Sequence, residues 1–334
     1  MAPPSPSELR SLLHRTLLDH LTPPHAEPRP ELTEYAALLR DYPERGGKFL
    51  RGILTCYSAL AHGASLAQAI PLGVALEMFQ NWVLIHDDIE DDSDERRGRP
   101  TLHRLVGVPL ALNAGDALHA RMWSYLLEAS LPLQVLKELA QTIELTAQGQ
   151  HLDLSWIDKG RFDLEPEDYL QMVAWKSAYY TVVAPLRLGA LLAGREPPEA
   201  YREGGLKLGI GFQIVDDLLN LKEASPAYGK ELAGDLWEGK RTLVLLLFLR
   251  EASPRERARA EALLHTPRRA KDPQEVAWLH QRLLQSQTIR EAEQHAEALL
   301  REALAILKPS LSALEQPAAG HLLEHLEGLV HRDA

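Results

Sequence analysis

The stretch that decides the fold is LEMFQNWVLIHDDIED, residues 76–91, in which an apolar run ends in paired aspartates. Within the helix expected over residues 66–92, residues 70–86 are apolar nearly all round, which is typical of a helix inside a bundle. Asp87 and Asp91 are four residues apart, so on a helix they point the same way and repel. A charged run is more often a solvated face, but a bare carboxylate pair at the end of a buried helix would be costly. A hard cation between the carboxylates would turn repulsion into coordination, and Mg²⁺ prefers such oxygen ligands.

A second apolar helix repeats this arrangement. Residues 206–215 run into DDLLN, residues 216–220, where Asp216 and Asn220 have the same four-residue spacing. Two such clusters on interior helices could face one another across a cavity. Mg²⁺ held by few carboxylates usually takes its other ligands from phosphate oxygens and water. The sequence therefore indicates a di- or polyphosphate substrate.

The rest of the chain also has helical periodicity. Leu and Ala abound and aromatic residues make up only 6% of the chain, which favours helix over sheet. Leu9, Leu13 and Leu17 recur at helical spacing, with Ser7 as the expected N-cap. The Pro-rich residues 22–30 then break the helix. Further helices are expected over residues 31–41, 48–62, 66–92, 109–129, 132–155, 166–193, 199–223, 240–250, 254–265, 273–286, 288–307 and 318–331, and no run of strands is expected.

Composition and charge exclude several classes of protein. The 36 Lys and Arg against 47 Asp and Glu give a net charge of -11, which argues against a nucleic-acid-binding surface. The single cysteine, Cys56, lies in an apolar run and is expected to be a small core residue, so no intrachain disulfide forms and a reducing cytoplasm is compatible. No stretch reaches the roughly 18 uninterrupted apolar residues of a membrane span, and the N-terminus lacks the pattern of a signal peptide. We therefore expect a cytoplasmic protein without a transmembrane segment.

Basic residues accompany the aspartates. Lys48 and Arg51 are three apart at an expected helix start led by Gly46-Gly47, a place suited to anions. Arginine binds phosphate through paired hydrogen bonds, and lysine contributes a point charge. Each basic residue alone is more often a surface charge, and only its position beside the aspartates favours a role with phosphate. The further candidates are Arg96, Arg97, Lys176, Lys230, Lys240 and Arg241.

Together these segments resemble the trans-prenyl diphosphate synthases. Residues 76–91 resemble the first aspartate-rich motif of that family, and GFQIVDD, residues 211–217, resembles the second. The intervening family motifs match, in order, GGK at 46–48, RRG at 96–98, KS at 176–177, GK at 229–230 and GKRT at 239–242. The resemblance spans about residues 44–250. It implies an all-α, single-domain helical bundle of the isoprenoid-synthase type around a central cavity, formed by residues 31–334 after a Pro-rich helix and connector in residues 1–30, and it implies a homodimer.

The resemblance also implies a reaction, the Mg²⁺-dependent condensation of isopentenyl diphosphate with an allylic diphosphate, and a role for each matching residue. The metal ligands would be Asp87, Asp91 and Asp216, supported by Asp88 and Asp217. The allylic diphosphate would be held by Arg96, Lys176, Lys230 and Lys240. Isopentenyl diphosphate would be held by Lys48, Arg51, Gln80 and Arg97. Oxygens near the developing allylic cation would come from Ser177 and Gln213.

Three positions depart from the family pattern. Gln80 stands where many members have His, and both can bind a phosphate oxygen. Ser177 replaces the commoner Thr and keeps the hydroxyl. Asn220 replaces the last aspartate of the second motif, which removes one negative charge and puts the metal affinity of that motif in question.

Product length would depend on the apolar helix before the first aspartates. Trp82 lies five residues before Asp87, about 7.5 Å along the axis, and Phe79 about 12 Å along it. An aromatic residue at position 82 with the small Val83 beside it resembles family members that make the twenty-carbon geranylgeranyl product, so that product is favoured over farnesyl diphosphate. Alternatively, Trp82 only packs between helices.

Three other functions compete with this interpretation. A terpene cyclase on the same fold would not need a second diphosphate site, so Lys48, Arg51 and Arg97 argue against it. A non-catalytic partner subunit would be marked by degraded aspartate motifs, whereas these are nearly complete. A calcium-binding helical scaffold would leave the basic residues unexplained.

Overall fold

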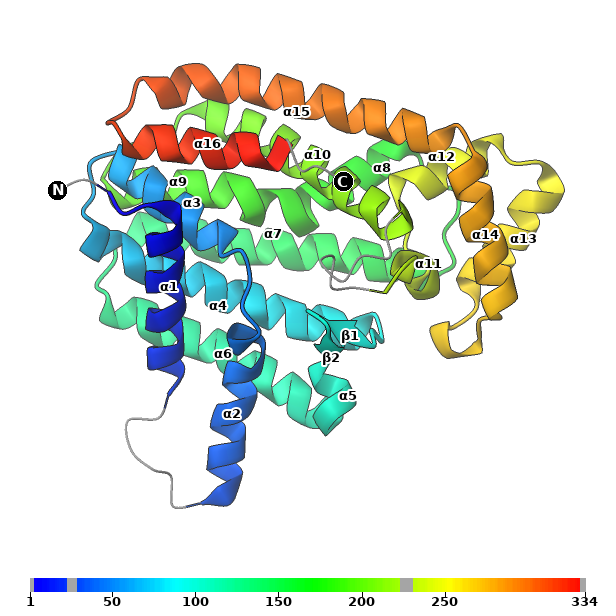
Figure 1. The fold of residues 1–334 in the computed structure, drawn as a ribbon, viewed down its shortest axis with the longest axis horizontal. Helices are drawn as coiled ribbons and strands as arrows, with labels where there is room; N and C mark the ends of the chain where they lie inside the picture. Colours follow the sequence, from blue (N-terminus) through cyan, green and yellow to red (C-terminus); the bar gives the residue numbers. More distant parts are fainter. Residues whose placement is uncertain (1–2, 23–28, 223–230, 331–334) are drawn as a thin grey trace. The chain divides into compact units, whose positions relative to one another are not determined.

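The computed structural model describes residues 3–22, 29–222 and 231–330, and these are almost entirely helical (Figure 1). The all-α fold predicted from the sequence is confirmed. In chain order the elements are α1 Pro6–Leu21, α2 Pro30–Glu44, α3 Leu50–Ala61, α4 Leu66–Glu90, β1 Glu95–Arg96, β2 Arg99–Pro100, α5 Leu102–Val106, α6 Val108–Glu128, α7 Leu133–Asp158, α8 Pro166–Val173, the π-helix η1 Ala174–Val183, α9 Ala184–Leu192, α10 Glu199–Lys222, α11 Gly234–Glu238, α12 Leu243–Glu251, α13 Pro254–His265, the 3₁₀ helix η2 Arg268–Ala270, α14 Pro273–Gln285, α15 Thr288–Ser312 and α16 Ala318–Val330.

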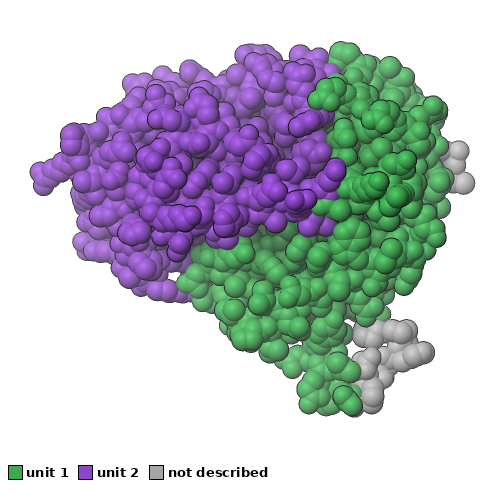
Figure 2. Space-filling model, turned by 180° about the vertical axis from the view of Figure 1, so that it is seen from behind, with its two compact units in different colours: residues 1–140, 184–201, 308–325 green, residues 141–183, 202–307, 326–334 purple. Residues whose placement is uncertain are grey.

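Contacts within the chain define two compact units, coloured separately in Figure 2. Unit 1 comprises residues 1–140, 184–201 and 308–325, and unit 2 comprises residues 141–183, 202–307 and 326–334. The first aspartate motif belongs to unit 1 and the second to unit 2. Helix α1 packs against α2, α3 and α4 within unit 1. The predicted division at residue 30 remains a prediction.

Unit 1 is built around α4, which packs against α1, α3 and α6. Residues 72–79 of α4 are all buried, as the apolar run predicts. Helices α3 and α4 approach closely at two glycines: a Cβ on Gly52 would lie 2.9 Å from the carbonyl oxygen of Gly73, and a Cβ on Gly73 would lie 2.9 Å from Cys56 Sγ. Cys56 is fully buried, which confirms its predicted place in the core.

The start of α1 differs from the prediction. Ser7 was the expected N-cap, but the helix begins at Pro6 and its N-cap is Ser5. Ser5 and Glu8 form a capping box, in which each side chain bonds to the backbone of the other residue. Such a box satisfies two amides that a helix start otherwise leaves without partners, so it outcompetes a serine lacking a glutamate three residues later.

Unit 2 contains a departure from regular α-helix. One helix was expected over residues 166–193, but η1 separates α8 from α9. Facing η1, Gly149 of α7 brings the two backbones so close that a Cβ there would lie 2.2 Å from the backbone nitrogen of Lys176. π-helical segments are rare and occur frequently at functional sites. In the described parts of both units, no helix is long and apolar enough to cross a membrane.

Candidate active site

The first aspartate motif lies at the carboxyl end of α4. The amide of Asp91 donates to the carbonyl oxygen of Asp87 at 2.8 Å, so the chain keeps its helical path through Asp91, the C-cap residue. The Asp87 side chain is 17% exposed, and Asp91 is buried. The two residues therefore lie one helical turn apart, as their spacing predicts.

Asp88 has a different environment from Asp87. It is completely buried, and its Oδ2 accepts a hydrogen bond from the Tyr42 hydroxyl at 2.5 Å. Nε of Arg96 donates to Oδ1 at 2.9 Å and to Oδ2 at 3.1 Å. Both oxygens are engaged, so Asp88 anchors Arg96 and Tyr42. Its support of a metal remains a prediction.

Arg96 and Arg97 face different partners because Arg96 ends strand β1 and Arg97 is the first residue of the β1–β2 turn. Arg96 pairs with Arg99 across the hairpin, and the two turn residues, Arg97 and Gly98, have φ of 55° and 70°. Left-handed conformations at both positions are typical of a two-residue hairpin turn and explain the glycine. Nη2 of Arg96 also lies 3.6 Å from Asp87 Oδ2, so Arg96 contacts both aspartates of the pair.

Arg97 belongs to a second cationic region of unit 1. Its Nη1 donates to the carbonyl oxygen of Tyr42 at 2.8 Å and to Asn81 Oδ1 at 3.5 Å. A Cβ on Gly47 would lie 3.2 Å from Arg97 Nη2, so a glycine leaves room for the guanidinium there. Burial lowers the pKa of Arg97 to about 10, with the positive charge of Arg96 adding to the effect.

The other residues predicted for isopentenyl diphosphate also lie in unit 1. Lys48 is exposed, Arg51 and Gln80 are half-buried, and Gln80 Oε1 has no hydrogen-bond partner among the described residues. The helix expected from residue 48 begins at Leu50, after Phe49 at φ 53°. The structure thus brings Arg97 beside the loop that carries Lys48, as a shared site requires.

The second aspartate motif lies on α10 in unit 2. Asp217 Oδ2 accepts a hydrogen bond from the Tyr169 hydroxyl at 2.7 Å, and Oδ1 accepts one from Gln213 Nε2 at 2.9 Å. Both donors are neutral. Burial raises the pKa of the Asp217 carboxyl, and the nearby negative charge of Asp235 raises it further. Gln213, predicted to lie near the allylic cation, orients this aspartate.

Asn220 binds backbone. Its Oδ1 accepts the amide of Asp235 at 3.2 Å, and its Nδ2 donates to the carbonyl oxygen of Glu231 at 3.4 Å. Asn220 is 2% exposed. The residue that departs from the family pattern thus holds the segment leading into α11.

Lys176 lies near the start of η1 and pairs with a carboxylate that the sequence did not single out. Its Nζ lies 2.5 Å from Asp153 Oδ2, and the Asp153 side chain is 3% exposed. Ser177 follows on the same π-helix and is half-buried. Asp153 follows Gly149 by one turn of α7, so one helix face supplies both the close approach and the counter-charge.

The segment Gly239–Thr242 contains two basic residues, Lys240 and Arg241, whose environments differ. Lys240 Nζ lies 2.6 Å from Glu238 Oε2 and is 18% exposed. Arg241 is completely buried: its Nε donates to the carbonyl oxygen of Arg161 at 2.8 Å, and its guanidinium stacks on Phe162. Arg241, a candidate phosphate ligand by sequence, is therefore structural, and Lys230 lies outside the described residues.

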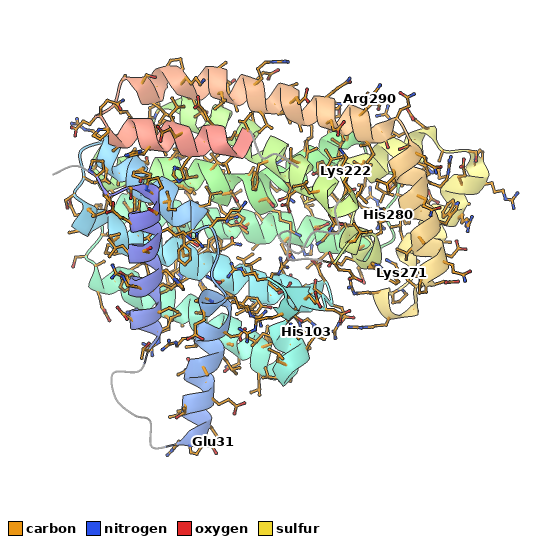
Figure 3. All side chains as sticks on the ribbon, viewed as in Figure 1. Glu31, His103, Lys222, Lys271, His280 and Arg290 are labelled. Atoms are coloured by element: carbon orange, nitrogen blue, oxygen red, sulfur yellow. The ribbon has the colours of Figure 1, made fainter. Side chains whose placement is uncertain are left out.

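Lys271, labelled in Figure 3, supports the same segment. Its Nζ donates to the carbonyl oxygens of Leu236 and Trp237 in α11, at 2.8 and 2.7 Å. A Cβ on Gly239 would lie 3.3 Å from this nitrogen. Burial lowers the pKa of Lys271 to about 8. Lys271 thus fixes the end of α11, two residues before Lys240.

The residues predicted to set product length lie on α4, where it packs against α6. Trp82 stacks on His119 of α6, with ring centroids 4.1 Å apart and an interplanar angle of 11°, and Phe79 lies 5.4 Å from Trp82. His119 Nε2 accepts a hydrogen bond from Trp123 Nε1 at 2.9 Å. Val83 is half-buried. Packing of Trp82 between helices is thus observed, and His119 is its partner.

Carboxylates of both motifs are chemically suited to a hard cation. Within residues 3–22, 29–222 and 231–330, however, no three His, Cys, Asp or Glu side chains are grouped closely enough to hold a metal ion. Asp87 and Asp91 provide oxygen donors one turn apart, which fits Mg²⁺ completed by phosphate and water. Asp88 and Asp217 are already hydrogen-bonded to protein groups.

The sequence pattern of the polyprenyl synthetase family matches residues 33–283. The chain belongs to this family. A geranylgeranyl pyrophosphate synthase of Geoglobus acetivorans is 31% identical over 306 residues, which cover 88% of this chain and 89% of that protein. A geranylgeranyl diphosphate synthase of Sulfolobus acidocaldarius is 35% identical over 209 residues, which cover 60% of this chain and 62% of that protein, less than two thirds of its length.

Solved structures of the polyprenyl synthetase family agree with the fold. The crystal structure of geranylgeranyl pyrophosphate synthase from Corynebacterium glutamicum, complexed with isoprenyl diphosphate and magnesium, matches with a TM-score of 0.86 and 27% identity, over 98% of each chain. The chain is thus a prenyltransferase of the polyprenyl synthetase family with the all-α fold of these enzymes. That relative was crystallised with a divalent metal, in agreement with the donor chemistry of Asp87 and Asp91.

Sequence reasoning missed the residues that hold the predicted ones in place. Tyr42 and Tyr169 each bind the second aspartate of a motif, and Asp153 pairs with Lys176. The tyrosines are 46 and 48 residues from their aspartates, so no local sequence spacing predicts these pairs. Asp153 had a usable signal, since it is an acidic residue one turn after a glycine on an expected helix.

Proposed function

We propose that this prenyltransferase condenses isopentenyl diphosphate head to tail with an allylic diphosphate, in a Mg²⁺-dependent reaction that yields geranylgeranyl diphosphate. The observation that carries the proposal is the separation of two cationic regions within unit 1. Arg96 is engaged by Asp87 and Asp88, whereas Arg97 lies beside Gly47 and Asn81. Two such regions suit two diphosphates. A terpene cyclase, which ionises one diphosphate, needs only one.

The residues named by the family resemblance have consistent chemical roles in this proposal. When bound, Mg²⁺ would neutralise charge on the departing diphosphate, with ligands from Asp87, Asp91 and Asp216. By the family resemblance, the departing diphosphate would be held by Arg96, Lys176, Lys230 and Lys240 as the allylic C–O bond breaks. Electrostatic stabilisation of a leaving group is worth most where water is excluded. Ser177 and Gln213 would place oxygens near the allylic cation. A C–C bond would then form between this cation and isopentenyl diphosphate, and the proton lost from the product would go to the released diphosphate.

The direct test is an assay of the purified chain alone. With isopentenyl and dimethylallyl diphosphates and Mg²⁺, we expect prenyl diphosphates that chromatography resolves by length, and we expect excess chelator to abolish them. A cyclic hydrocarbon would indicate a cyclase instead. Condensation only after addition of a second protein would indicate a partner subunit.

Product length is tested at Trp82. If the Trp82 ring closes the end of the tunnel for the growing chain, Trp82→Ala should lengthen the product by one or more isoprene units. The reason is that the tunnel would then end further along α4, toward Phe79. His119→Ala should act in the same direction, since it removes the ring on which Trp82 stacks. The matched control is Trp278→Ala, a tryptophan of unit 2 that packs under Arg259. An unchanged product from a folded Trp82→Ala variant would exclude Trp82 as the floor, and a fifteen-carbon wild-type product would make the chain a farnesyl diphosphate synthase.

We also propose that the protein is a cytoplasmic homodimer. Helices α5 and α6 expose large apolar side chains, with Leu105 50%, Val108 48%, Leu112 44% and Leu127 68% exposed. Exposed apolar groups gathered on two consecutive helices are typical of an interface, and a second copy of the chain is the simplest partner. Leu112→Glu should shift the mass measured by light scattering toward the monomer. Leu284→Glu, at a 43% exposed leucine of α14, should not; equal masses for both variants would place the interface elsewhere.

A further inference from the structure

Glu77 is a buried carboxylate that the reaction scheme leaves without a role. It lies within the apolar run of α4, and only 5% of it is exposed. A charge in such a place is costly unless hydrogen bonds and opposite charges compensate it. The compensating groups therefore reveal what the residue does.

The first compensating group is the amino end of α3. The N-cap of α3, Phe49, has no side-chain cap, so the amides of the first turn need other acceptors. Glu77 Oε1 accepts the amide of Gly52 at 2.8 Å, and the backbone of Arg51 also hydrogen-bonds the carboxyl group. Glu77 thus caps α3 from a neighbouring helix. We expected an anion from the substrate at this glycine-led helix start, but a carboxylate of the protein occupies it.

The second compensating group is a pair of arginines. The positive charges of Arg51 and Arg97 both favour the ionised form of Glu77, although burial has the larger effect and raises its pKa. Arg97 in turn reaches Asn81, which lies one turn after Glu77 on α4, at 3.5 Å. Glycine at position 52 leaves room for the Glu77 side chain, since a Cβ there would lie 3.2 Å from Glu77 Cγ and 2.9 Å from the carbonyl oxygen of Gly73. The carboxylate that caps α3 is therefore also the one on which the two arginines predicted to bind isopentenyl diphosphate act electrostatically.

We propose that Glu77 is a positioning residue for the isopentenyl diphosphate site, holding Arg51 and Arg97 toward one substrate while capping α3. This inference rests on the proposed function. It implies that the diphosphate is recognised by side chains and not by the amides of α3. It also implies that loss of the Glu77 charge affects one substrate and not the other.

The test is Glu77→Gln, which keeps an oxygen for the Gly52 amide and removes the charge. We expect the KM for isopentenyl diphosphate to rise about tenfold, equivalent to about 1.4 kcal/mol, with the KM for the allylic substrate within twofold of wild type. The matched control is Glu138→Gln in the same unit, a buried glutamate paired with Arg187 at 2.7 Å. A merely structural role would lower stability in both variants and change neither KM selectively. Equal changes in both KM values for Glu77→Gln would overturn the proposal.

A double-mutant cycle tests whether Glu77 acts through Arg97. If it does, Glu77→Gln should raise the KM for isopentenyl diphosphate much less in an Arg97→Gln background than in wild type, because residues in contact are not additive. If the effects of the two substitutions on the KM for isopentenyl diphosphate are fully additive, Glu77 does not act through Arg97.

Two further readouts do not depend on turnover. If the wild-type chain forms no product, the proposed function fails, and the inference is judged by binding of inorganic pyrophosphate in calorimetry and by amide exchange. We expect Glu77→Gln to weaken pyrophosphate binding several-fold, and Glu77→Ala to speed exchange of the Arg51 and Gly52 amides, with no such changes in Glu138→Gln. Unchanged pyrophosphate affinity together with unchanged exchange would overturn the inference.

Discussion

The two aspartate pairs have the same sequence but different electrostatic surroundings. In unit 1, the second aspartate, Asp88, has a full positive counter-charge from Arg96 and a hydrogen bond from Tyr42. In unit 2, the second aspartate, Asp217, accepts hydrogen bonds from the neutral donors Tyr169 and Gln213. Among the residues that the structure describes, the second aspartate of each pair thus has a tyrosine anchor, and Asp88 has an arginine anchor as well.

This difference in counter-charge gives the two motifs different electrostatic properties. A buried ion pair with Arg96 fixes the position of Asp88, so the first motif is organised before any ligand binds. Neutral hydrogen bonds compensate Asp217 only partly, and its pKa is raised by burial and by Asp235. The charge of the second motif therefore responds more strongly to its surroundings. In both motifs the second aspartate is anchored to protein groups, and we expect the first one, Asp87 or Asp216, to be the ligand of the cation.

The largest expected effect is at Asp87. Asp87→Ala should reduce turnover by about 10²–10³, the cost of losing a main electrostatic stabiliser, while the protein stays folded. The matched control is Asp92→Ala in the same acidic run, whose carboxylate pairs with Arg104 at 2.5 Å. Steady-state rates at saturating Mg²⁺ measure the effect. Near-normal condensation by Asp87→Ala would remove it from the metal site.

The ionic anchor should cost more to break than the neutral one. Arg96→Met leaves Asp88 as an unpaired buried charge and should lower the free energy of unfolding by about 3–5 kcal/mol. Tyr169→Phe removes one hydrogen bond to Asp217 and should cost about 1–3 kcal/mol. Urea unfolding measures both, and Arg96→Met combined with Asp88→Leu should recover part of the loss. If Tyr169→Phe costs as much as Arg96→Met, the contrast between the two motifs is wrong.

Asp217 should give unit 2 a distinct pH dependence. Its pKa is higher in the folded than in the unfolded chain, so its contribution to stability is complete below the unfolded value of about 4 and is lost as the pH rises through the folded value. In chelator, Asp217→Asn should therefore lose less stability than wild type between pH 4 and pH 8, by about 1.4 kcal/mol for each unit by which the pKa is raised. Parallel unfolding curves for the two proteins would show that Asp217 is not the titrating group.

The sequence predicted the features that depend on local spacing. The helices follow from a period of 3.6, and both aspartate pairs were recognised because each ends an apolar helix. The capping box of α1 was also accessible, since Ser5 and Glu8 have the required spacing and Ser7 has Arg10 at the third position.

Contacts between distant residues could not be predicted in this way. Tyr42 and Asp88 meet only because α2 packs on α4, and η1 depends on the close approach of Gly149. The burial of Arg241 has the same origin, because its partners are backbone carbonyls about 80 residues away. Spacing alone marks a basic residue as a phosphate ligand, whereas packing decides whether its side chain is available.

The smallest expected effect is at Asn220, where the second motif lacks its last aspartate. Asn220→Asp restores the family residue but replaces the Nδ2 donor with an oxygen that faces the carbonyl of Glu231. The amide of Asp235 keeps an acceptor, so we expect a loss of about 1 kcal/mol in unfolding free energy and no tighter binding of Mg²⁺. Calorimetric titration with Mg²⁺ and a non-reactive diphosphate, beside urea unfolding, measures both quantities. A tenfold gain in Mg²⁺ affinity would mean that position 220 belongs to the metal site. The asparagine of this chain would then be the loss of a metal ligand, and its contacts with the segment before α11 would be secondary.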